Sequence, residues 1–248
     1  MKFVFFSLVL NAALLCAARD TRADLTILQR VEGLGPASEM TIKIKGDKVR
    51  MEISPKVTTI FDGKTGEMTN LMNDEKTVVR ISADKMKAAA EMITKFSPKK
   101  AAAEKPKLVA TGQRETLNGY ETEQYFYEGP DFKATYWIAL KYPDGPDILK
   151  QLQAIKSEAW TTANTKLPDY RDFPGLPLRT RMVVKKGTTT GEQGAVADRG
   201  TEITSTITSV KQDLLSDSEF AIPKDFKEVE MPDIFGGKSA APAVSPRR

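Results

Sequence analysis

From Leu25 to Ile81 the sequence alternates apolar and polar residues in one short run after another. The clearest runs are residues 40–45 (MTIKIK) and 49–54 (VRMEIS), with a Gly-Asp turn between them. Apolar residues at every second position are typical of a strand that buries one face and exposes the other. Together with further runs at 57–61, 68–72 and 77–81, this region predicts an antiparallel meander of six strands.

The spacing of apolar residues changes after Ser82, which is a suitable N-cap for a helix over 83–96. The apolar positions of this segment, three or four residues apart, are Met86, Ala89, Ala90, Ile93 and Phe96. A second helix is predicted at 147–160, where one stripe holds Ile148, Leu152, Ile155 and Ala159. Both helices therefore have one apolar face that must be covered.

Strand patterns resume beyond a Pro-, Ala- and Lys-rich connector over 97–107, and an Asn-Gly pair predicts one tight hairpin. The further strands are expected at 108–116, 120–128, 132–141, 178–186 and 201–211. The fold class is therefore mainly β (α+β): a large curled antiparallel sheet, or unclosed β-barrel, of about ten to eleven strands covered by two amphipathic helices. We expect a single half-barrel domain over 24–235 and a disordered basic tail over 236–248.

A curled sheet whose concave face is covered by helices is a candidate apolar pocket. Tyr136 and Trp137 point to opposite faces of their strand, so that one of them at most can line such a pocket. The candidate lining residues are Met40, Ile42, Met51, Met68, Met72, Met86, Ile93, Tyr136 and Ile155. The alternative interpretation is that the same side chains interdigitate as a solid core.

Residues 1–23 have the pattern of a signal peptide, because Lys2 precedes an apolar run over 3–15 that is too short to span a bilayer. Cleavage is favoured after Ala23, with Ala18 as the alternative. A lipid anchor on Cys16 is disfavoured because a leucine precedes it. The sequence predicts export to the periplasm of a Gram-negative-type bacterium and no transmembrane segment.

The sequence contains no histidine, and its one cysteine, Cys16, lies in the predicted leader. Disulfides, zinc sites built from Cys or His, iron–sulfur clusters, thiol nucleophiles and imidazole-based triads are therefore excluded from the processed chain. No cofactor and no metal site are expected. The formal net charge of +4 falls to +2 without the leader, which argues against nucleic acid as a partner.

Two patterns offer remote alternatives as a hydrolase. Ser82 and Lys85 form a Ser-x-x-Lys sequence at a helix start, but Ser82 is explained equally well as the helix cap. Glu121 and Glu123 share one strand face about 7 Å apart, a spacing compatible with paired catalytic carboxylates but also with a solvated face. We therefore expect no catalytic residue.

Three stretches, residues 40–51, 59–67 and 220–229, resemble an uncharacterised bacterial envelope family, a domain of unknown function. That family is in turn distantly similar to the LolA/LolB outer-membrane lipoprotein carriers. The matching features are Gly46 at a strand end, Arg50 in the next strand, a strand closed by Asp62-Gly63, and Phe220-Ala-Ile-Pro223. The resemblance implies an unclosed barrel with a helical lid and an acyl-chain cargo.

The resemblance also implies a role for Arg50 as a contact to the lid or the cargo. The alternative is an outward-facing arginine bonded to neighbouring carboxylates. Residues and resemblance together favour a non-enzymatic binding or carrier protein for a lipid, an acyl chain or another apolar ligand. The alternative function is a structural or interaction module of the cell envelope that has a filled core and an envelope protein as its partner.

Overall fold

The computed structural model describes residues 23–33, 35–96, 107–129, 132–154, 168–185 and 201–230. In these ranges most of the chain is in strands, and two α-helices interrupt the strand succession. The elements, including two short 3₁₀ helices (η), are β1 (Leu25–Glu32), β2 (Ser38–Lys45), β3 (Lys48–Ser54), β4 (Val57–Asp62), β5 (Glu67–Met72), β6 (Thr77–Ile81), α1 (Ala83–Phe96), β7 (Val109–Leu117), β8 (Tyr120–Glu128), β9 (Phe132–Ala139), α2 (Gly145–Ala154), η1 (Tyr170–Asp172), β10 (Leu176–Val184), β11 (Glu202–Lys211), η2 (Asp217–Phe220) and β12 (Lys227–Glu228).

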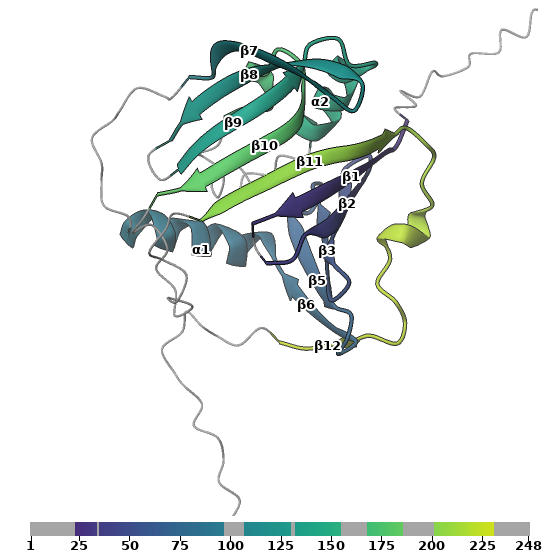
Figure 1. The fold of residues 1–248 in the computed structure, drawn as a ribbon. Helices are drawn as coiled ribbons and strands as arrows, with labels where there is room; N and C mark the ends of the chain where they lie inside the picture. The colour runs from purple at the N-terminus through teal and green to yellow at the C-terminus, as the bar shows by residue number, and fades with distance from the viewer. Residues whose placement is uncertain are drawn as a thin grey trace, which may run out of the picture.

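The strands of the described residues form one sheet of 12 strands in the order β12-β6-β5-β4-β3-β2-β1-β11-β10-β9-β8-β7. β1 lies in the interior of this order, where it pairs with β2 on one side and with β11 on the other. Every neighbouring pair is antiparallel except β12 and β6, which run parallel. Figure 1 shows the sheet curling from β7 to β6.

The curl brings the turn between β7 and β8 back to β11, although β9 and β10 separate them in the sheet. The side-chain amide of Asn118 in that turn donates to the carbonyl of Ile207 at 2.6 Å. Asn118 and Gly119 both have positive φ, 50° and 83°, as a tight hairpin turn of this type requires. The hairpin predicted from the Asn-Gly pair therefore exists and also ties two parts of the sheet together.

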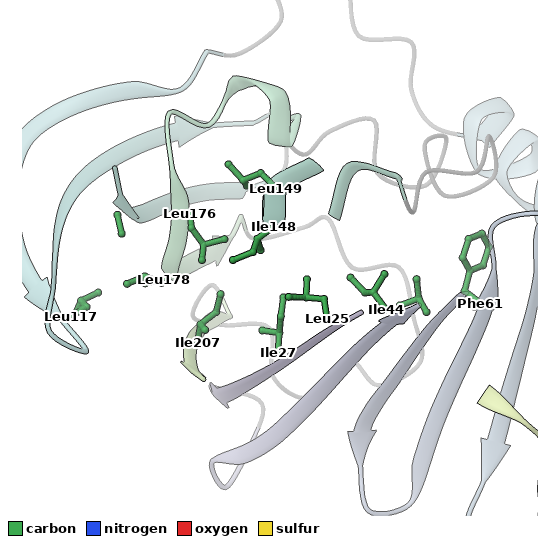
Figure 2. Packing of buried hydrophobic residues seen from close by; sticks show 12 residues of the cluster. Leu25, Ile27, Ile44, Phe61, Leu117, Ile148, Leu149, Leu176, Leu178 and Ile207 are labelled. Carbon is green, nitrogen blue, oxygen red and sulfur yellow. The ribbon is translucent and has the colours of Figure 1, made fainter. Parts of the chain in front are cut away.

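The main core lies on the concave side of the sheet, which we call the inner face. Leu25 and Ile27 of β1, Ile44 of β2 and Phe61 of β4 point to this side, and Ile148 of α2 belongs to the same cluster (Figure 2). All five are at most 3% exposed. Burial of this apolar surface is the main driving force that holds α2 against the sheet.

A segment that we call the strap, residues 212–226, connects β11 to β12 and crosses the opposite, outer face of the sheet (Figure 1, yellow-green). Ile222 and Phe226 of the strap pack on a small outer cluster of Ile60, Leu71 and Val78. The sheet therefore has apolar contacts on both faces, with the larger core inside.

The predicted fold class is confirmed: a large unclosed antiparallel sheet with two helices. The first helix has the predicted bounds, 83–96. The second helix begins at Gly145, two residues before the predicted start at 147. Pro146 lacks an N–H group and therefore fits the first turn of a helix. The predicted last part of this helix, 155–160, lies outside the described residues, as does the basic tail over 236–248.

Candidate ligand-binding site

The inner face of β2–β6 is built from rows of side chains that the strand register places side by side. One row runs from Leu25 through Ile44, Val49 and Phe61, each at most 3% exposed, to Met68 and Ile81. Met86 of α1 packs against the same cluster, since the helix starts directly after β6. This end of the inner face is the more buried one.

The inner face becomes more exposed away from that row. The next row consists of Ile27, Ile42, Met51, Thr59, Asn70 and Val79, of which Ile42, Met51, Asn70 and Val79 are half-buried. Beyond it lie Met40, Val57 and Met72, which are also half-buried. We call the second and third rows of the inner face together the open floor.

The two faces of β2–β6 differ completely in charge. Between Met40 and Ile81 the inner positions carry only uncharged side chains. The outer positions of the same strands include Lys43, Lys45, Arg50 and Glu52. A ligand on the open floor would therefore meet apolar and neutral polar groups.

Thr59 and Asn70 are the polar pair of the open floor. They are directly opposite each other on β4 and β5, and the Thr59 hydroxyl donates to Asn70 Oδ1 at 2.8 Å. The predicted site residues did not include this pair. The signal that could have found it is a polar residue at an inward position of two neighbouring strands that are otherwise apolar on that face.

Five of the predicted lining residues, Met40, Ile42, Met51, Met68 and Met72, lie on the same inner face. Met86 joins them from α1 through its contact with the main core. Ile93 is part of α1, but its side chain lies outside the described part of the structure. Ile155 is outside the described residues altogether.

Tyr136 lies apart from the other predicted lining residues. It is 6% exposed in a second cluster on β8 and β9, where its ring meets the edge of Phe173 at a centroid distance of 4.9 Å. Trp137, on the opposite side of the same strand, packs against the main core instead. The two residues do point to opposite faces, and Trp137 is the one on the side of the methionines.

Trp137 is a second residue absent from the predicted site. Its indole Nε1 is buried and has no hydrogen-bond partner in the part of the chain that the structure describes. The guanidinium carbon of Arg179 lies 5.5 Å from the ring centroid, and Arg179 also donates to Glu115 and to Thr206, each at 3.3 Å. The Arg179 charge is therefore already engaged within the sheet.

Arg50 lies on the outer face, away from the open floor. Its Nε donates to Glu52 at 2.9 Å, and its Nη1 donates to the backbone carbonyl of Glu219 in the strap at 2.9 Å. Of the two arrangements considered for Arg50, the structure has the outward-facing one with a neighbouring carboxylate. Its further contact is with the strap.

Ion pairs fasten the strap along the outer face. Lys43 Nζ donates to Glu219 at 2.7 Å, and Lys45 Nζ lies 2.8 Å from Asp217. Hydrogen bonds from these lysines lower the pKa of each carboxyl group below its ordinary value. At the far end, the bond from Lys76 lowers the pKa of Asp225 in the same way. Lys43, Lys45 and Lys76 therefore bind the strap through ion pairs.

The residues considered for catalysis have structural partners. Ser82 Oγ accepts a hydrogen bond from the Lys85 backbone N–H at 3.3 Å, as a helix cap does. Glu121 pairs with Arg114 at 3.2 Å, and the hydroxyl of Tyr125 lies 3.5 Å from Glu123. Among the described residues there is no cluster of three acidic or cysteine side chains able to hold a metal ion.

Comparison with protein families matches residues 28–226 to DUF4412, a domain of unknown function. The match extends from β1 through the strap and so takes in most of the chain. The chain belongs to the DUF4412 family. The expectation of a family defined by a domain of unknown function is thereby confirmed.

Several solved structures are similar to this DUF4412 chain. PNGF-II shares 12% identity at a TM-score of 0.38, with 84% of this chain and 32% of PNGF-II covered, so the chain spans about a third of that protein. The Mycobacterium tuberculosis lipoprotein LppX shares 12% identity at a TM-score of 0.34, covering 81% of this chain and 93% of LppX. A DUF1329 family protein from Desulfovibrio piger shares 10% identity at a TM-score of 0.28, covering 82% and 91%.

None of the curated proteins matches the chain. In the described part of the structure, no helix has the length and apolar character needed to cross a membrane.

Proposed function

We propose that this chain is an exported, non-enzymatic binding or carrier protein of the bacterial periplasm. Its ligand is apolar, a lipid or an acyl chain, and lies on the open floor of the inner face. The observation that carries the proposal is that Met40, Met51 and Met72 are only half-buried, whereas Leu25, Ile44, Val49 and Phe61 on the same inner face are at most 3% exposed. Flexible methionine side chains adapt to irregular apolar ligands.

The surroundings of the open floor support binding over catalysis. Known ligand sites are mainly apolar and contain a small number of placed polar groups, which here are Thr59 and Asn70. Export is supported by the charged start and the short apolar run of residues 1–23. These residues lie outside the described part of the structure, except for Ala23.

Binding is tested with protein purified from a periplasmic extract. Native mass spectrometry should find a lipid bound to the wild-type protein, and an apolar fluorescent dye should compete with that lipid. Met72→Lys places a charge on the open floor and should weaken dye binding by about tenfold or more, because the ammonium group must lose water there.

Thr41→Lys is the matched control, because it adds the same charge to a half-buried position on the outer face of the same sheet. Its dye affinity should equal that of the wild type. A wild-type protein without lipid or dye binding would reject the proposal.

A second candidate function, an interaction module of the cell envelope, is favoured by one observation. β7 ends the sheet, and eight of its nine residues are exposed, with Val109 at 56%. Unpaired backbone groups on such an edge can add a strand from a partner. Absence of any apolar ligand, together with loss of a defined envelope complex in Val109→Pro, would support this function instead.

A further inference from the structure

Asn70 lies on β5 in the row of the open floor that also contains Met51, Thr59 and Val79. On its own strand its same-face neighbours are Met68 and Met72, and across the strands it faces Thr59 on β4 and Val79 on β6. Neutral side chains, three of them apolar, therefore flank one carboxamide.

The hydrogen bond from Thr59 determines which polar group of the Asn70 side chain remains available to a ligand. Thr59 is 5% exposed, and its hydroxyl donates to Asn70 Oδ1 at 2.8 Å. The Nδ2 group, with two N–H donors, has no hydrogen-bond partner among the described residues, and Asn70 itself is only half-buried. Two donors are thus free to meet a ligand on the open floor.

The charge distribution limits the kind of acceptor that these donors can meet. The inner positions between Met40 and Ile81 include no cationic side chain. The cations of the same strands, Lys43 and Arg50, lie on the outer face and bond to the strap. A carboxylate on the open floor would lose its hydration and gain no counter-charge, whereas a carbonyl oxygen needs only the donors that Asn70 has.

We infer that Asn70 binds the carbonyl oxygen of an esterified acyl chain, and that this site takes neutral acyl esters in preference to free fatty acids. The inference rests on the proposed function and names the ligand class. The acyl chain lies along the methionines, and the ester carbonyl accepts from Asn70 Nδ2. Thr59 is a positioning residue that holds the amide in this orientation.

The experiment compares three fluorescent probes that share one chain: pyrene-labelled palmitate, its methyl ester, and the corresponding pyrene-labelled alkane. Affinities are measured at neutral pH, where the palmitate probe in solution is ionised. The wild-type protein should bind the ester at least about tenfold more tightly than the free acid.

Two variants test the role of the amide. Asn70→Leu keeps a similar volume and removes the donors, so ester affinity should fall about fivefold while alkane affinity is retained. Asn70→Lys adds a cation and should reverse the preference in favour of the free acid. Thr69→Val is the control, since this buried threonine lies on the outer face of the same strand.

Each outcome separates the inference from the proposed function. Equal binding of ester and alkane by the wild type, unchanged in Asn70→Leu, overturns the role of Asn70 and leaves apolar binding in place. A wild-type preference for the free acid also overturns the inference. Absence of binding for all three probes overturns both. Circular dichroism of each variant confirms that it is folded before its affinities are compared.

Discussion

The side chains of the inner face differ in burial, and point mutations can distinguish fully buried side chains from half-buried ones by their effect on the free energy of unfolding. Phe61 is 2% exposed within the main core, whereas Met72 is half-buried on the open floor. Truncating a fully buried side chain loses its transfer free energy and leaves a cavity. Truncating a side chain that already contacts water loses only part of the transfer free energy and leaves no closed cavity.

We therefore expect Phe61→Ala to lower the free energy of unfolding by about 3–5 kcal/mol and Met72→Ala by about 1 kcal/mol. Urea unfolding of both variants, followed by far-UV circular dichroism, measures the difference. A loss in Met72→Ala as large as that in Phe61→Ala would mean that the inner face is a filled core.

At the scale of elements, the strap is held by apolar contacts on the outer face. Phe226 packs against the cluster that contains Leu71 and Val78, which are 1% and 3% exposed. Phe226→Ala should lower the free energy of unfolding by about 2 kcal/mol, since the ring is partly buried. It should also speed amide hydrogen exchange in β6, the partner of β12.

Leu214→Ala is the control for this change, because Leu214 belongs to the same segment and is 90% exposed. Its unfolding free energy should stay within about 0.5 kcal/mol of the wild type. Equal effects of the two substitutions would show that the strap does not depend on its contact with the outer cluster.

The strap should also respond to acid. Hydrogen bonds from Lys43 and Lys45 lower the pKa of Glu219 and Asp217 in the folded protein. A lowered folded pKa gives a stability contribution that is present above the unfolded value, roughly 4, and is lost as pH falls through the folded value. We expect the thermal unfolding midpoint to drop on acidification below about pH 5.

Glu219→Gln isolates one of these groups while an amide oxygen can still accept the bond from the Ser216 N–H. The variant should start from a lower midpoint at neutral pH and lose less of it on acidification. An acid response identical to that of the wild type would assign the pH dependence to other carboxyl groups.

Alternation and turn residues were enough to predict eleven strands and the start of the first helix, because these elements depend on local pattern. β12 was not predicted. It has two residues, Lys227 and Glu228, and pairs with β6 through tertiary contact, so no period exists to detect. The strap was missed for the same reason: its ion pairs join residues such as Lys43 and Glu219 that are far apart in sequence.

At the scale of the whole molecule, Asn118 connects the end of the sheet to its middle. Its side chain bonds to the Ile207 carbonyl, and its backbone has a φ of 50°. Asn118→Gly keeps the turn and should lose about 1 kcal/mol for the hydrogen bond. Asn118→Ala should lose about 1–2 kcal/mol more, because alanine is strained at positive φ.

Thermal and urea unfolding of the two variants separate the two contributions. If Asn118→Gly were as stable as the wild type, the bond to β11 would have no part in holding the curl. Gln113→Ala is the control, because Gln113 is an exposed residue of β7 in the same hairpin. Its unfolding free energy should remain within about 0.5 kcal/mol of the wild-type value.

The candidate site shows which of its residues the sequence alone can place on a common face. Met40, Met51 and Met72 share a face because short turns preserve the register from β2 to β5. Tyr136 does not join them, since β1, β11 and β10 lie between its strand and β2 in the sheet. The order of strands that are far apart in sequence depends on how the whole chain packs, and no local sequence pattern predicts it.

The pairing of β1 with β11 also has a consequence for the time course of folding. β1 is the first strand of the sheet in sequence, yet one of its two partners follows only after nearly all other strands. Contacts between such distant residues slow folding, because a long loop must close before they form. During synthesis, β1 therefore keeps an unpaired edge until β11 has emerged, and a chaperone that covers this edge should raise the yield of native protein.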